Sequence, residues 1–72
     1  MNEKNLILKI GQKIKEIRLS KSMTLDDLAA ASNMDNSSVA GLESGNTNPT
    51  IRTLYKISQG LKIKLKELVD VE

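Results

Sequence analysis

The sequence predicts a small all-α domain. Apolar residues recur at spacings of three and four along most of the chain, a pattern that places them on one face of a helix. Residues that favour helix N-termini precede three of these stretches, at Thr24, Asp35 and Thr50. No two segments show the alternating pattern of paired strands. The 72 residues are enough for one domain, residues 1–72, with a small core.

Five helices joined by short loops are expected. They cover, in order, about residues 6–19, 24–32, 35–44, 50–61 and 65–69. The inner stripe of the first helix is Ile7, Ile10, Ile14 and Ile17, and that of the fourth is Ile51, Leu54, Ile57 and Leu61. Asp27 is a possible capping-box partner of Thr24. Asn33 suits the left-handed backbone conformation that a tight turn requires, and Gly45 is expected to end the third helix.

The composition argues against an enzyme. There is no Cys and no His, so the usual metal ligands and nucleophile–base pairs are absent, and neither a metal nor a cofactor is expected. Asp26 and Asp27 are adjacent carboxylates, but adjacent residues on a helix do not face one point. Their place in the first turn of a helix explains why two acidic residues stand there, so no small-molecule substrate is needed to account for them.

The N-terminal residues lack the apolar stretch of a signal peptide, and no apolar run is long enough to cross a bilayer. The lysines are not gathered opposite an aromatic apolar face, which argues against a membrane surface. A cysteine-free domain also suits a reducing compartment. We therefore expect a cytoplasmic protein.

Charge is distributed unevenly along the chain. Residues 1–22 carry a net charge of +4 and residues 52–72 carry +2, whereas residues 23–51 contain no Lys or Arg and carry −4. Within that acidic stretch, two capped helices flank a tight turn. This arrangement predicts a helix-turn-helix motif over about residues 24–44, whose second helix can enter the major groove of DNA. Ala29, Ala30 and Gly41 are small enough to allow close approach between the elements.

Residues 10–68 resemble the lambda-repressor/Cro-like (Xre-type) helix-turn-helix DNA-binding family. The matching segments are IGQKIKEIR at 10–18, MTLDDLA at 23–29, Val39, Glu43, Gly45, NPT at 48–50, LYKI at 54–57 and LKEL at 65–68. Asn33-Met34-Asp35 followed by Gly41 is also similar to controller proteins of restriction–modification systems. The resemblance implies a compact five-helix fold and a recognition helix over about residues 35–44.

The resemblance also implies site residues. Those expected to face bases are Asn36, Ser37, Ser38, Ala40 and Gly41, and those expected near phosphates are Thr24, Ser44, Asn46 and Thr47. Asn36 is the best candidate reader, because an amide can bond bidentately to adenine; the alternative is an ordinary surface residue of the first turn. Arg18 and Glu43 occupy positions of a structural ion pair in family members.

The sequence departs from the family pattern at Leu25, where a polar residue such as Gln is usual, and at Gly41, where a long polar side chain is common. Basic residues are also missing around residues 44–47, so cations would have to come from Lys9, Lys13, Arg52, Lys56 or residues 62–66. Lys62 stands where Gly is favoured, and Lys64 where a Ser or Asp cap is favoured.

Two functions remain open. The first is a transcriptional regulator that binds double-stranded DNA as a homodimer. The two copies are expected to pair through the fifth helix and the end of the fourth, using exposed apolar residues such as Leu65, Leu68, Val69 or Val71. The second is a protein-interaction module, or a variant impaired in DNA binding, on the same fold.

Overall fold

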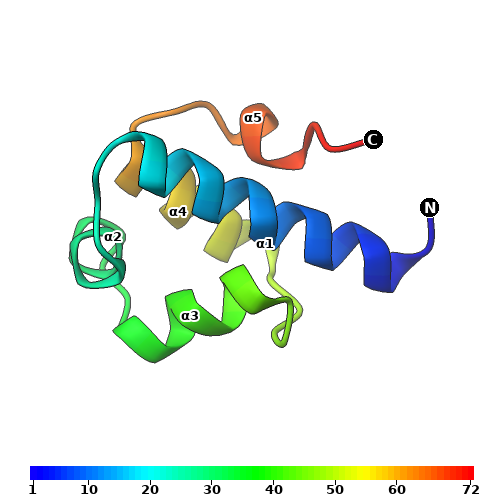
Figure 1. Ribbon diagram of the computed structural model, residues 1–72, viewed down its shortest axis with the longest axis horizontal. Coiled ribbons are helices and arrows are strands. Elements are labelled where there is room, and N and C mark those ends of the chain that lie inside the picture. Colours follow the sequence, from blue (N-terminus) through cyan, green and yellow to red (C-terminus); the bar gives the residue numbers. More distant parts are fainter.

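The computed structural model describes all 72 residues and contains five helices and no strand. They are α1 (Glu3–Ser20), α2 (Leu25–Ala31), α3 (Asn36–Ser44), α4 (Ile51–Leu61) and α5 (Leu65–Val69). The predicted all-α class and the number of helices are confirmed. In Figure 1, α1 crosses the middle of the molecule, with α5 on one side of it, α3 on the other, and α4 behind it.

The first helix begins earlier than predicted. It starts at Glu3 rather than near Leu6, because the side chain of Asn2 caps it. The Asn2 Oδ1 atom accepts a hydrogen bond of 2.8 Å from the backbone N–H of Asn5. Apolar periodicity marks the part of a helix that is buried, so it could not locate this exposed first turn.

Both ends of α2 and the C-terminal end of α3 agree with the local sequence signals. Thr24 and Asp27 form the predicted capping box: the Asp27 N–H donates to Thr24 Oγ1 at 3.0 Å, and the Thr24 N–H donates to Asp27 Oδ2 at 2.9 Å. Asn33 adopts the left-handed conformation with φ of 56°, and Gly45 ends α3 with φ of 78°. Lys62, which follows α4, also adopts the left-handed backbone conformation, with φ of 60°.

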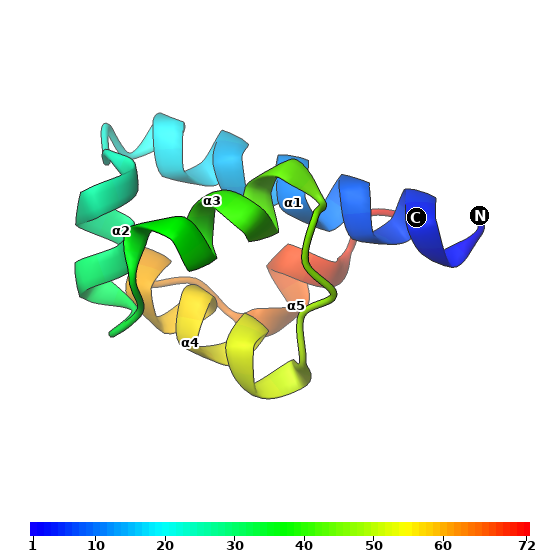
Figure 2. The ribbon, with the colours of Figure 1, turned by 90° about the horizontal axis from the view of Figure 1, so that it is seen from below.

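One apolar core joins all five helices. Its members are Ile10, Ile14, Leu28, Ala29, Val39, Leu42, Leu54, Ile57, Leu61 and Leu68. Two predictions about this core were wrong. Ile51 is 69% exposed rather than on the inner face of α4, because the first turn of α4 extends beyond the other helices (Figure 2). Leu68 is fully buried, because α5 packs this residue against α1 and α4.

The helices approach most closely at two glycines that the sequence analysis did not select. A Cβ atom at Gly11 would meet the backbone carbonyl groups of Leu42 and Glu43, so this glycine lets α1 lie directly against α3. A Cβ atom at Gly60 would meet Ser32, where α4 passes the end of α2. The predicted role was wrong for Ala30, which is exposed. At Gly41 a Cβ atom would meet the Thr47 side chain of the loop after α3, so the approach there is between α3 and that loop and not between two helices.

Ser32 gives the first testable prediction. Its hydroxyl is buried without a hydrogen-bond partner in the protein, and leaving such a group unpaired costs free energy. Ser32→Ala should therefore raise the free energy of unfolding by about 1 kcal/mol, measured by urea denaturation. Ser58→Ala is the matched control, because the Ser58 hydroxyl is equally buried but donates to the Tyr55 carbonyl at 2.7 Å. Equal effects of the two variants would contradict the prediction.

Candidate nucleic-acid interface

Helix α3 lies on the outside of the molecule with one face open. Val39 and Leu42 turn into the core, and the first turn of the helix is exposed. In Figure 2 no other element lies in front of α3. The outer side of α3 is therefore accessible from outside the molecule.

The candidate base readers lie along this open side. Asn36, Ser37 and Ser38 are exposed, and Ala40 and Gly41 are half-buried. One of these side chains already has a partner in the protein. The Nδ2 atom of Asn36 donates a hydrogen bond of 2.6 Å to Oδ1 of Asp26, on the first turn of α2.

Asp35 occupies the N-cap position of α3, but it does not cap the helix in the way predicted. Its side chain makes no cap hydrogen bond, and its carboxylate instead accepts one of 2.9 Å from the Ser37 hydroxyl. Hydrogen bonding by the side chains of Ser38 and then Ser37 holds the pKa of Asp35 below the usual range of aspartates. Asp35 is thus ionised at neutral pH, beside the helix terminus that a phosphate would approach.

The four candidate phosphate contacts lie at the two ends of the motif, and two of them are already engaged. Thr24 Oγ1 accepts the capping hydrogen bond from Asp27, and the Ser44 hydroxyl donates to the Gly41 carbonyl at 3.1 Å. Asn46 and Thr47 are exposed on the loop after α3. Of the four residues, these two have the polar side chains that are most available to contact a phosphate.

Arg18 and Glu43 form a buried ion pair between α1 and α3. The Arg18 Nε atom lies 2.7 Å from Glu43 Oε2, and Nη2 lies 3.0 Å from Oε1, so the contact is bidentate. Arg18 Nη1 also donates to the Met23 carbonyl at 2.8 Å. The two side chains are only 8% and 7% exposed. This pair ties the second half of α3 both to α1 and to the chain that enters α2.

Arg18 keeps its charge in spite of burial. Hydrogen bonding to Glu43 raises the pKa of Arg18, against the opposing effect of desolvation. Neither side chain is free to contact a phosphate. The arrangement therefore positions α3 and does not itself provide a DNA contact.

Leu25 has a structural reason to replace a polar residue. It is half-buried and packs against the core, so its side chain contributes apolar contact at the start of α2. A polar side chain there would give up that packing.

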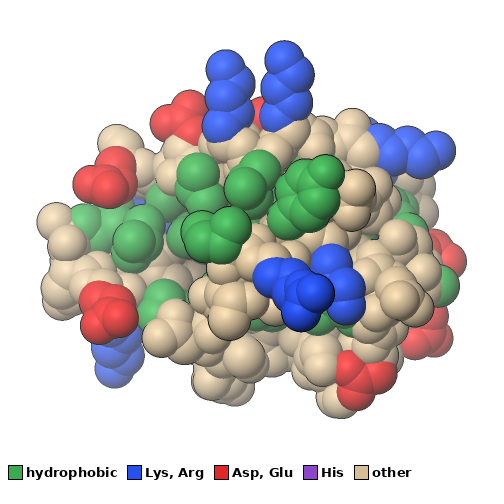
Figure 3. All heavy atoms as spheres, turned by 180° about the vertical axis from the view of Figure 1, so that it is seen from behind, with side chains coloured by type: hydrophobic (Ala, Val, Ile, Leu, Met, Phe, Trp, Pro, Cys, Tyr) green, Lys and Arg blue, Asp and Glu red, His purple; other side chains and the backbone are tan.

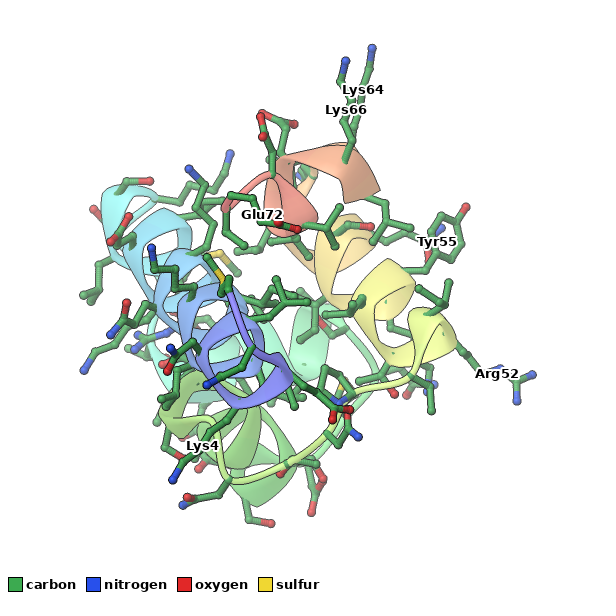
Figure 4. All side chains as sticks on the ribbon, turned by 90° about the vertical axis from the view of Figure 1, so that its right-hand side faces the viewer. Lys4, Arg52, Tyr55, Lys64, Lys66 and Glu72 are labelled. Carbon is green, nitrogen blue, oxygen red and sulfur yellow. The ribbon has the colours of Figure 1, made fainter.

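Five of the cations lie away from α3, namely Lys9, Lys13, Arg52, Lys64 and Lys66. Lys9 and Lys13 of α1 line a shallow hollow together with Asp70, which follows α5. In Figure 1, α5 lies on the side of α1 opposite to α3. In Figure 4, Lys64 and Lys66 point away from the bundle beside α5, and Arg52 points away from α4. These side chains are poorly placed to compensate for the acidity of the motif.

Lys4 lies on the same side as α3, and its position was not predicted from the sequence. It lines a hollow with Gly45 and Asn48, and in Figure 4 it extends on the same side of the molecule as α3. The early start of α1 at Glu3 brings this lysine beside the loop after α3. The Asn2 cap was the sequence signal that could have revealed it.

No helix is long and apolar enough to cross a membrane. No group of three or more His, Cys, Asp or Glu side chains comes together as a metal site.

Comparison with known proteins identifies the family. The helix-turn-helix family model (HTH_3) matches residues 14–68, most of the chain. The chain belongs to the helix-turn-helix family. The matched range begins within α1 and ends in α5, so it includes both partners of the ion pair and the whole of α3.

Several members of this family are similar over nearly their full length. The chain is 36% identical over 67 residues to the control protein C.BamHI of Bacillus amyloliquefaciens, covering 92% of this chain and 83% of that protein. It is 34% identical to the control protein C.MunI of a Mycoplasma species, covering 90% of each. The crystal structure of the restriction–modification controller protein C.AhdI from Aeromonas hydrophila superposes with a TM-score of 0.84 at 34% identity, covering 86% of this chain and 94% of that one.

The buried ion pair gives the second prediction. Arg18→Met leaves the Glu43 carboxylate buried and unpaired, which should lower the free energy of unfolding by about 3–5 kcal/mol. The double variant Arg18→Met/Glu43→Leu removes both charges and should recover most of that loss, because desolvation offsets much of the attraction in such a pair. Urea denaturation of both variants measures the difference. A double variant no more stable than the single one would contradict this account.

Proposed function

We propose that the protein is a DNA-binding transcriptional regulator that reads the major groove with α3, as a homodimer. The observation that carries the proposal is the open outer side of α3, on a helix that a buried ion pair holds against α1. The control proteins to which the chain is similar support a regulatory role of this kind. These relatives are bacterial proteins, and bacterial DNA lies in the cytoplasm, so we expect this protein to act there.

In this proposal the first turn of α3 enters the groove. Asn36 reads a base edge, and Ser37, Ser38, Ala40 and Gly41 lie against neighbouring bases or backbone. Thr24, Ser44, Asn46 and Thr47 lie near phosphates at the two ends of the motif. Two copies related by a twofold axis would present their α3 helices to successive major grooves, about 34 Å apart.

An apolar patch supports the proposed homodimer. We call it the α4–α5 patch and define it by the exposed apolar residues of these two helices, Ile51, Tyr55 and Val69, which are 69%, 53% and 40% exposed. Hydrophobic side chains gather in the middle of the face shown in Figure 3, the face toward which Tyr55 points in Figure 4. Contiguous exposed apolar surface of this kind marks an interaction site. The patch uses the start of α4 rather than its end, where Ser58, Gly60 and Leu61 are buried.

Selection from random duplex DNA tests the function. The purified protein should enrich a twofold-symmetric site, and Asn36→Ala should lose the preference for one base pair in each half-site, at a cost of about 1–3 kcal/mol. Binding is measured by fluorescence polarisation at several salt concentrations. No enrichment and no binding at low salt would overturn the proposal.

The acidity of residues 23–51 favours a second candidate, a protein-interaction module. Gly41→Arg distinguishes the two, because only the Thr47 side chain lies near Gly41 and can turn aside. If α3 faces DNA, the added cation should increase affinity for duplex DNA. Absence of DNA binding by both the wild-type protein and this variant would contradict the first function and favour the second.

Lys4 provides the third prediction. If it contacts a phosphate beside the loop after α3, Lys4→Gln should weaken binding to all sequences and reduce the salt dependence, as the slope of log K against log salt, by roughly one. Lys64→Gln is the matched control, because it removes the same exposed charge from a side chain that points away beside α5. Equal salt slopes for the two variants would show that Lys4 makes no such contact.

The α4–α5 patch provides the fourth prediction. Tyr55→Glu places a charge in the middle of the patch and should convert a dimer to a monomer, measured by sedimentation at several concentrations. Leu19→Glu is the matched control, because Leu19 is 57% exposed but lies at the end of α1. A dimer that survives Tyr55→Glu would place the interface elsewhere.

A further inference from the structure

We infer that Asp26 positions the amide of Asn36 for base readout across the helix-turn-helix. The inference rests on the proposed function and assigns to Asp26 a role that helix capping does not explain. The Thr24 and Asp27 side chains complete the capping box of α2 by themselves. The Asp26 carboxylate is directed instead to Asn36, on the first turn of the next helix, at 2.6 Å.

The chemistry of this contact fixes which way the Asn36 amide faces. An ionised carboxylate can only accept hydrogen bonds, so the amide must present its NH₂ group to Asp26. The bond involves one charged partner, which makes it stronger than a bond between neutral groups. Asn36 would otherwise be a freely rotating surface side chain. Holding it in one orientation lowers the entropy lost when DNA binds.

The donors and acceptors that remain match one base. One hydrogen of Asn36 Nδ2 is used by Asp26, which leaves a second hydrogen and the carbonyl oxygen Oδ1. Adenine presents an acceptor, N7, and a donor, the N6 amino group, in the major groove. The remaining pair on Asn36 is complementary to both. Guanine presents two acceptors at this edge, so the oriented amide disfavours it.

Asp26 also has an electrostatic effect that works in the opposite direction. Its negative charge, added to that of Asp35, repels phosphates from the start of α3 and weakens binding to any sequence. Asp26 therefore reduces non-specific affinity while it favours adenine. Only the positioning of Asn36 changes the ratio of affinities for right and wrong sites, because the charge lowers both affinities alike.

Two substitutions separate positioning from charge. Asp26→Asn and Asp26→Ala each remove one negative charge, so both should raise affinity for non-specific duplex DNA equally. Asp26→Asn keeps an oxygen that can accept from Asn36, whereas Asp26→Ala does not. The ratio of affinities for adenine and guanine at the selected position should therefore be roughly tenfold lower in Asp26→Ala than in Asp26→Asn.

The same pair is then compared in the Asn36→Ala background, where the two substitutions at Asp26 should bind DNA alike. An equal adenine preference in the two single variants would overturn the inference. So would a difference between them that persists without Asn36. Thermal denaturation of each variant shows whether the fold is retained.

A measurement without DNA distinguishes failure of this inference from failure of the proposed function. In the free protein, NMR relaxation of the Asn36 side-chain amide should show an ordered group in the wild type and in Asp26→Asn, and a mobile one in Asp26→Ala. A mobile amide in the wild type would overturn positioning by Asp26. An ordered amide in a protein that selects no DNA sequence would overturn the proposed function, and the inference with it.

Discussion

The outward presentation of α3 depends on its contact with α1, and that contact has two parts. At Gly11 the backbones of the two helices meet with no room for a side chain. About two helical turns further along α1, Arg18 holds Glu43 in a bidentate pair and also donates a hydrogen bond to the Met23 carbonyl. The first part sets how closely the helices approach. The second sets the position of α3 along α1, because a two-point hydrogen-bonded contact allows little sliding.

Features that depend on neighbouring residues in the chain were predictable. Thr24 with Asp27, Thr50, Asn33 and Gly45 all behave as their local signals indicate, because caps and left-handed turns are decided within about one helical turn. The number and order of the helices follow from the same signals combined with apolar periodicity. The two partners of the ion pair were accessible only through the family resemblance, since they lie 25 positions apart.

Features that depend on how the helices pack were not predictable in this way. Periodicity identifies an apolar face, but it does not say how far along a helix other elements cover that face. Ile51 was therefore assigned to the core and Leu68 to the surface, and both assignments are reversed in the fold. The contact between Asp26 and Asn36 was missed for the same reason, because it requires α2 and α3 to be placed relative to each other.

The acidity of the motif is easier to understand once these contacts are known. Each carboxylate from Asp26 to Glu43 has a partner within the protein: Asn36 for Asp26, the Thr24 N–H for Asp27, Ser37 for Asp35, and Arg18 for Glu43. The charges thus organise the helix pair, and they do so without a cation on its surface. A motif built this way contributes little of the general attraction that basic residues provide for DNA. Its discrimination between sites must then come from shape and hydrogen bonding at α3, and its affinity from cations outside the motif and from the pairing of two copies.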